Sequence, residues 1–180
     1  MALLSADRRY TGRVINLDVD QVRFPDGAVG ALEMIRHPGA SAVVPFLDPI
    51  GDPDPRIILI RQFRHAADGP IWEIPAGRLE PGEQPADCAR RELGEETGYQ
   101  AGELQQLTTI YTTPGFTDER IHLFTAGVLR QGEAHREWDE FLEVHTLAWS
   151  RIIDMVRTGE IVDAKTLVAL MFVQCIVRKP

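Results

Sequence analysis

Stretches of alternating apolar and polar residues open the chain and predict an antiparallel arrangement of short strands. These strands are predicted at residues 13–19, 21–24 and 28–35. Pro25-Asp26-Gly27 is a turn signal between the last two strands, which are therefore expected to form a hairpin. In the first strand, the candidates for the buried face are Val14, Leu17 and Val19.

The rest of the chain mixes continuous apolar runs with segments of helical period. Strands are predicted at residues 40–47, 56–62, 107–112, 120–129 and 143–149, and the first two of these are apolar enough to be covered on both faces. Helices are predicted at residues 85–96, 150–158 and 164–177. Pro85 suits a first helical position, Gly98 can end that helix, and Ser150 can cap the next one. This mixture predicts an α/β sandwich with helices on both faces of a mixed sheet.

Composition narrows the class of protein. A chain of 180 residues is long enough for one compact domain with a small extension. Its 27 acidic and 19 basic residues give a net charge of −8, which provides no general attraction for nucleic acid or an anionic membrane. Two cysteines are too few for a disulfide scaffold, and no apolar run suits a signal peptide or a bilayer span. We therefore expect a cytoplasmic protein that binds neither nucleic acid nor membrane.

The helix predicted at residues 85–96 carries a cluster of carboxylates. Glu92, Glu95 and Glu96 are spaced by three and four residues, which places them together on one helix face. Like charges at this spacing repel one another, so the cluster is either a solvated acidic face or a site for a divalent cation. Oxygen ligands favour Mg²⁺, with Mn²⁺ as the alternative, over softer metals.

The residues around this cluster favour the metal site. The segment 77–99, GRLEPGEQPADCARRELGEETGY, fits the pattern G-x5-E-x7-R-E-U-x-E-E-x-G-U, in which U is bulky and apolar. A chance match in a chain of this length is on the order of one in a million or rarer. The pattern is the Nudix box, and the chain resembles Nudix hydrolases. The fixed positions of the box are occupied by Gly77, Glu83, Arg91, Glu92, Leu93, Glu95, Glu96, Gly98 and Tyr99.

The resemblance extends from about residue 12 to residue 177 and is to the ADP-ribose pyrophosphatase and nucleoside-diphosphate-sugar branch. The segments that carry it are LEMIRHPGASAVVP, RQFRHAADGPIWEIPAG, TTPGFTDERIHLF and DEFLEVHTL. It implies a Nudix-type α/β/α sandwich with a mixed sheet and an N-terminal antiparallel β extension. We expect the extension to cover residues 1–38, where it would face the substrate and a second subunit, and the Nudix hydrolase domain to cover residues 39–180.

The resemblance also implies Mg²⁺-dependent hydrolysis of a diphosphate, in which the metal activates water and neutralises phosphate charge. Gly77 would let the backbone approach the metal closely. Glu83 and Arg91 would organise the loop and the helix of the box. The implied metal ligands are Glu92, Glu95, Glu96, Glu140 and the backbone carbonyl of Ala76.

The base that takes a proton from water is expected in the acidic segment 135–144, HREWDEFLEV. Glu140 fits the acidic position that closes on the metals in relatives. The ADP-ribose enzymes often have the base two residues earlier, where this chain has Trp138. The candidates for the base are therefore Glu140, followed by Asp139 and Glu137. A solvated run of charges is the alternative interpretation of the segment.

Contacts with the substrate are expected from charged and aromatic side chains. Arg64 is the first candidate for a phosphate contact, because a planar guanidinium matches phosphate oxygens, and Arg36 is the second. Glu33 and Glu73 either accept hydrogen bonds from ribose hydroxyls or a base amine, or pair with a neighbouring arginine. Trp138 is a candidate for stacking on the base or the sugar.

The function that the resemblance implies is hydrolysis of ADP-ribose to AMP and ribose 5-phosphate. GDP-mannose or another nucleoside diphosphate sugar is the alternative substrate. A different class of function, a module that senses ADP-ribose without hydrolysing it, predicts a damaged box, whereas this box is complete. Relatives in the branch are dimers that often exchange N-terminal strands, so a homodimer is expected.

Overall fold

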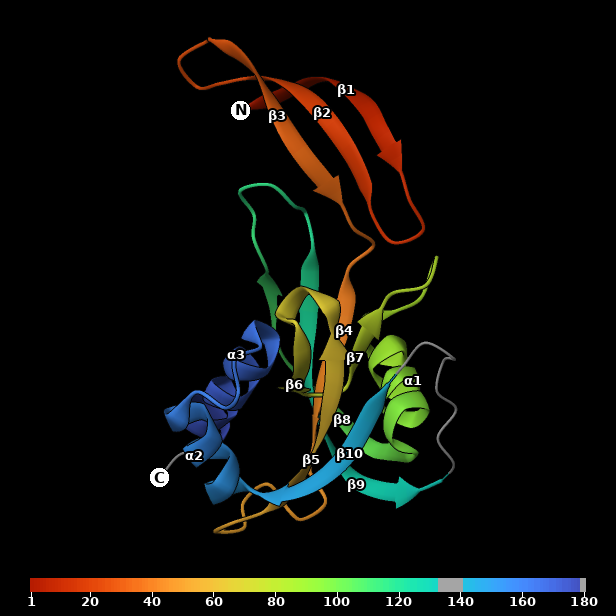
Figure 1. The fold of residues 1–180 in the computed structure, drawn as a ribbon, viewed down its shortest axis with the longest axis vertical. Coiled ribbons are helices and arrows are strands. Elements are labelled where there is room, and N and C mark those ends of the chain that lie inside the picture. Colours follow the sequence, from red (N-terminus) through yellow and green to blue (C-terminus); the bar gives the residue numbers. More distant parts are fainter. Residues whose placement is uncertain (133–140, 179–180) are drawn as a thin grey trace.

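The computed structural model describes residues 1–132 and 141–178, and these residues form three sheets and three α-helices. The sheets have the strand orders β1-β2-β3, β10-β5-β6 and β7-β4-β9-β8. Figure 1 shows the first sheet projecting away from the other two, which lie together between the helices.

The projecting sheet contains β1 (Ala2–Thr11), β2 (Asn16–Arg23) and β3 (Val29–Arg36), all antiparallel. The predicted hairpin between β2 and β3 is confirmed: Phe24 N donates to Ala28 O at 2.8 Å, and Gly27 has a φ of 88°. The predicted strands at 13–19 and 21–24 are one strand that begins at Asn16. Strand β1 was not predicted, because all of its residues are exposed and no buried face leaves a periodic pattern.

The buried face of β2 was predicted wrongly. Val14 is exposed, whereas Asp18 and Asp20 are 5% and 6% exposed. The carboxylates tolerate this burial because arginines pair with them: Arg36 binds both, and Arg8 also binds Asp18. Hydrogen bonds from Arg8, followed by those from Arg36, hold the pKa of Asp18 below its ordinary value even though burial acts in the opposite direction.

The core forms around the two apolar strands predicted to be covered on both faces, which are confirmed as β4 (Ala40–Pro45) and β5 (Arg56–Arg64). Every residue of β4 is buried, and residues 57–60 of β5 are fully enclosed. Strand β4 runs parallel to β9 (Arg120–Gln131) and antiparallel to β7 (Ala76–Arg78), so the sheet is mixed, as predicted.

The remaining strands differ from the prediction at their ends. Strands β7 and β6 (Gly69–Glu73) were not predicted, because they are short and interrupted by glycine and proline. Strand β8 (Tyr99–Tyr111) begins well before the predicted residue 107. Its first half is a polar edge of the sheet without a continuous apolar face. Strand β10 (Leu142–Ala148) lies close to its predicted position.

The helices cover both sides of the sheets. Helix α1 (Pro85–Thr97) packs on β4, β7 and β8, whereas α3 (Ala164–Phe172) packs on β4, β6 and β9. Figure 1 shows α1 on one side and α2 (Trp149–Thr158) with α3 on the other, which confirms the α/β sandwich. Pro85 begins α1 and Gly98, with a φ of 78°, ends it, as predicted. A short η1 (His65–Ala67) follows β5, and η2 (Val173–Val177) continues α3 with π-helical geometry.

Among the described residues, no helix combines the length and the apolar character that crossing a bilayer requires. The cytoplasmic location and the absence of binding to nucleic acid or membrane stay predictions from the sequence.

The start of α2 differs from the prediction in the residue that caps it. Ser150 lies inside the helix, and its backbone N–H donates to Asp54 Oδ1 at 2.8 Å. The Ser150 hydroxyl donates to the other carboxylate oxygen of Asp54 at 2.9 Å. The helix is therefore capped by a loop residue far away in the sequence, which no local pattern could reveal.

We predict that Asp54→Ala lowers the free energy of unfolding by about 1 kcal/mol, because it leaves the Ser150 N–H in the first turn of α2 without its acceptor. Urea unfolding measures the loss. Asp52→Ala, in the same exposed loop, is the matched control and should leave stability unchanged. Equal stability of the two variants would show that Asp54 does not cap α2.

Candidate active site

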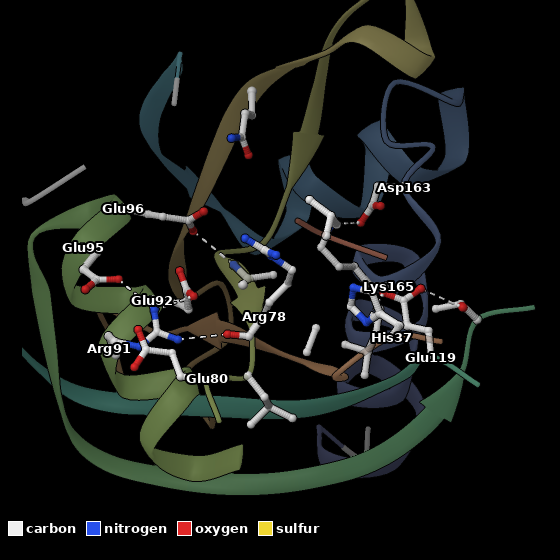
Figure 2. A pocket seen from close by; sticks show the side chains of 18 of the residues that line it. His37, Arg78, Glu80, Arg91, Glu92, Glu95, Glu96, Glu119, Asp163 and Lys165 are labelled. Atoms are coloured by element: carbon white, nitrogen blue, oxygen red, sulfur yellow. Dashed lines mark hydrogen bonds and ion pairs between the residues drawn. The ribbon is translucent and has the colours of Figure 1, made fainter. Parts of the chain in front are cut away.

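A cavity of about 750 Å³ lies where α1 and β7 meet the end of β5 and the start of α3. Its walls come from segments far apart in the sequence. Figure 2 shows Glu92, Glu95 and Glu96 of α1 on one side, with Lys165 and Asp163 across the cavity. The two sides are called the acidic wall (Glu92, Glu95 and Glu96) and the cationic wall (Arg64 and Lys165) below.

The acidic wall contains two buried carboxylates. Glu92 is 8% exposed and Glu96 is 1% exposed, while Glu95 lies nearer to solvent. Glu96 is oriented by the backbone of β7, because Ala76 N donates to Glu96 Oε2 at 3.0 Å. The backbone of the box therefore lies against the carboxylates, as a joint set of side-chain and main-chain ligands would require.

Gly77 is required by this close approach. A Cβ atom at this position would lie 1.8 Å from Glu92 Oε1 and 2.0 Å from Glu92 Cδ, so no other residue fits without moving Glu92. The fixed glycine of the motif thus has a steric explanation in the structure.

Arg91 joins two members of the acidic wall, Glu92 and Glu95, to Glu83. Its Nε and Nη2 donate to the two carboxylate oxygens of Glu83 at 2.8 and 3.0 Å. Its Nη1 lies between Glu92 and Glu95, at 2.7 and 2.9 Å from their nearest oxygens. The Arg91 hydrogen bonds lower the pKa of Glu83 to about 2, whereas burial acts in the opposite direction. One arginine therefore joins the loop before α1 to the carboxylates on the helix.

The cationic wall is built around a buried carboxylate. Glu73 on β6 is 1% exposed and accepts two hydrogen bonds from Arg64, at 2.7 and 2.9 Å, and one from Lys165. Burial alone would raise the pKa of Glu73, but hydrogen bonding with Arg64 and the charge of Lys165 outweigh it and lower the pKa. The bonds to Glu73 use Nε and Nη2 of Arg64 and fix the plane of its guanidinium at the cavity.

Residues at the start of α3 support this wall, and the sequence interpretation missed them. Asp163 accepts hydrogen bonds from Lys165 Nζ and Thr166 N, both at 3.0 Å. The Thr166 hydroxyl accepts from Ile74 N at 2.9 Å, which joins α3 to the strand segment beside Glu73. A signal was available, since Asp163 is a favoured N-cap residue and directly precedes the helix predicted at residues 164–177.

Comparison with known proteins identifies the family. The NUDIX domain model matches residues 36–170. This chain belongs to the NUDIX family. It is 41% identical to the ADP-ribose pyrophosphatase of Bacillus subtilis (strain 168). The aligned 173 residues cover 95% of this chain and 91% of that protein. It is also 39% identical over 127 residues, 66% of each chain, to the GDP-mannose pyrophosphatase of Escherichia coli O1:K1 / APEC.

A solved structure, "Crystal structure of ADP compounds hydrolase", superimposes with a TM-score of 0.80 at 21% identity, covering 96% of this chain and 91% of that one. At this identity the similarity shows the fold alone. The Nudix fold expected from the motif is therefore confirmed by the family match and by the superposition.

The donor set of the Nudix box fits a hard divalent cation, because it consists of carboxylate oxygens and main-chain carbonyls. Within residues 1–132 and 141–178, however, no three acidic, histidine or cysteine side chains form a ready-made metal group. Arg91 Nη1 lies between Glu92 and Glu95, within hydrogen-bonding distance of both. Two of the three carboxylates expected together from helical spacing, Glu92 and Glu95, are thus bridged by an arginine, and Glu96 accepts a hydrogen bond from Ala76 N.

Two predicted substrate contacts lie away from the cavity. Arg36 pairs with Asp18, Asp20 and Asp118, and it joins the projecting sheet to the segment before β9. Glu33 is exposed on β3. Four further candidates, Glu137, Trp138, Asp139 and Glu140, lie outside the described residues. Of the predicted site residues, the cavity brings together Arg64, Ala76, Gly77, Arg91, Glu92, Glu95 and Glu96, and Glu73 contacts Arg64 without lining the cavity itself.

We predict that Glu83→Gln lowers the free energy of unfolding at pH 7 by about 1–2 kcal/mol, because it removes a charged partner of Arg91. The folded-state pKa of Glu83, about 2, lies below its ordinary value of 4.5. The stabilisation is therefore complete above pH 4.5 and is lost as the pH falls towards 2.

Urea unfolding of both proteins at pH 7, 5, 4 and 3 measures this effect. The difference in stability should shrink towards the acidic end. Glu103→Gln, on an exposed position of β8, should show no such difference. A gap between wild type and Glu83→Gln that stays constant over this range would contradict the ion pair.

Proposed function

We propose that this chain hydrolyses the diphosphate bond of a nucleoside diphosphate sugar, with ADP-ribose as the first candidate and AMP and ribose 5-phosphate as products. The observation that carries the proposal is the pairing of an acidic wall with a cationic wall across one cavity. A diphosphate needs positive charge on both sides, from cations on the carboxylates and from Arg64. The name of the Bacillus subtilis relative supports ADP-ribose.

Glu92, Glu95, Glu96 and the carbonyl of Ala76 would hold Mg²⁺, or Mn²⁺ in its place. When bound, such an ion supplies charge neutralisation and a more acidic water. For the carboxylates to serve as ligands, Arg91 Nη1 has to yield its position between Glu92 and Glu95, while its two bonds to Glu83 keep the side chain anchored. Glu83 and Arg91 thus support the ligands in this proposal.

Arg64 would bind a phosphate oxygen with the donor that Glu73 leaves available, Nη1. In this proposal, Glu73 positions Arg64 and does not bind a ribose hydroxyl. The base that takes the proton from water is proposed to be Glu140, with Asp139 and Glu137 as alternatives, and Trp138 is the proposed stacking residue. All four belong to the segment outside the described residues.

GDP-mannose is the second candidate substrate, supported by the name of the Escherichia coli relative. The sensor alternative is disfavoured by the complete acidic wall and by the steric fit between Gly77 and Glu92.

We also propose a homodimer formed through the projecting sheet, whose strand β1 is exposed along its whole length. Leu3, Leu4 and Tyr10 are 60%, 48% and 59% exposed there, and a second subunit that covers β1 would bury them. In a dimer, Glu33 and Arg36 of this sheet could reach the cavity of the second subunit and act as the substrate contacts that the sequence suggested.

Incubation with ADP-ribose and Mg²⁺, followed by chromatography, tests the activity. We expect AMP release by the wild type and a loss on the order of 1,000-fold in Glu96→Gln, because one proposed ligand of the metal becomes neutral. Circular dichroism and melting curves should match those of the wild type. Near-normal turnover by folded Glu96→Gln would remove Glu96 from the metal site, and no nucleoside monophosphate from any nucleotide sugar would favour the sensor.

Light scattering after gel filtration tests the dimer. The wild type is expected at twice the 20.2 kDa mass of one chain, and Leu3→Glu combined with Leu4→Glu at one chain, because the charges prevent burial of β1. Val128→Glu, similarly exposed on β9, is the control and should stay dimeric. A dimeric double variant would locate the interface elsewhere.

A further inference from the structure

Gln62 on β5 is a buried polar residue at the cavity with an unused hydrogen-bonding group. The residue is 5% exposed and lines the cavity. Its Oε1 atom is enclosed and accepts no hydrogen bond from any residue that the structure describes. Rotation of the terminal amide by half a turn exchanges Oε1 with Nε2, so this position offers either an acceptor or a donor.

The neighbouring buried polar groups are satisfied. Glu73 accepts from Arg64 and Lys165, and Thr166 both accepts from Ile74 and donates to Asp163. An enclosed carboxamide without a partner destabilises the folded state relative to an apolar side chain of the same size. Unlike Glu73 and Thr166, Gln62 has a buried polar atom without a hydrogen-bond partner. Because Gln62 lines the cavity, this indicates that a group entering the cavity supplies the missing hydrogen bond.

The position of Gln62 limits what that group can be. Gln62 lies two residues before Arg64 on the same strand, and both line the cavity, about 7 Å apart along the chain. If Arg64 holds a phosphate, Gln62 lies roughly one sugar ring away from it. A phosphate oxygen only accepts hydrogen bonds, whereas a hydroxyl both donates and accepts, so a hydroxyl satisfies the amide in either orientation.

We propose that Gln62 binds a sugar hydroxyl of the nucleotide sugar and thereby favours sugar-bearing diphosphates over simpler ones. This inference rests on the proposed function, because it takes the phosphate contact of Arg64 from there. A water molecule also carries O–H groups, and a contact with the attacking water would affect turnover and leave binding unchanged.

The variant Gln62→Met tests the inference, since methionine keeps the length of the side chain and removes its hydrogen bonds. Calorimetry with Mg²⁺ compares two ligands: a non-hydrolysable methylene analogue of ADP-ribose, and methylene diphosphonate, which lacks the sugars. We expect the Kd for the ADP-ribose analogue to rise about 5- to 10-fold and the Kd for methylene diphosphonate to stay unchanged.

The melting temperature separates binding from a structural role. Gln62→Met should melt at the same temperature as the wild type or higher, because it removes an unsatisfied buried group. Gln105→Met, on an exposed position of β8 outside this cavity, is the matched control and should change neither property. A lower melting temperature with unchanged affinity, or a variant that does not fold, would make Gln62 structural and overturn the inference.

Removal of single hydroxyls from the ligand provides a second measurement. Among ADP-ribose analogues that each lack one sugar hydroxyl, one should bind about 5- to 10-fold more weakly, and Gln62→Met should abolish that difference. Equal losses of affinity for the ADP-ribose analogue and for methylene diphosphonate would assign Gln62 to the diphosphate. A fall in kcat with an unchanged Kd would assign Gln62 to the attacking water. Either result would overturn the inference. If the wild type hydrolyses no nucleotide sugar, the proposed function fails; if it does and Gln62→Met binds normally, only the inference on Gln62 fails.

Discussion

The repulsion between buried carboxylates on one face of α1 is the constraint on which the rest of the site depends. Glu92 and Glu96 lie almost entirely out of water, where unpaired negative charges are strongly unfavourable. Ala76 N donates a hydrogen bond to Glu96, and Arg91 donates one to Glu92. Gly77 in the adjoining segment allows the backbone to approach Glu92 closely. The oxygen atoms of these carboxylates are the kind of ligand that a hard divalent cation prefers.

On the opposite wall of the cavity, a buried carboxylate holds two positive charges in place. Arg64 and Lys165 stay at the cavity because Glu73 is buried between them, and Glu73 is itself tolerated only because both cations contact it. This arrangement gathers β5, β6 and the start of α3 around one carboxylate. Positive charge is therefore held in a fixed position before any ligand enters, which lowers the cost of orienting it when a diphosphate binds.

The sequence was informative wherever structure and chemistry are local. The acidic wall, the limits of α1 and the apolar strands β4 and β5 were predicted, because period, capping residues and the spacing of the box are visible within short windows. The cationic wall was predicted only in part, since Lys165 meets Glu73 across 92 positions and no local pattern marks the contact. The same reason explains Asp54, which caps a helix that begins 95 residues later, and the buried Asp18 and Asp20, whose arginine partner comes from another strand.

Titration of Mn²⁺, followed by electron paramagnetic resonance in the presence of a non-hydrolysable ADP-ribose analogue, tests the central claim most directly. The account predicts saturable uptake of the ion by the wild type and loss of that uptake when Glu92 and Glu96 are both replaced by glutamine. Uptake that is equal in the two proteins, or absent from the wild type, would contradict the claim that α1 holds its carboxylates for a metal.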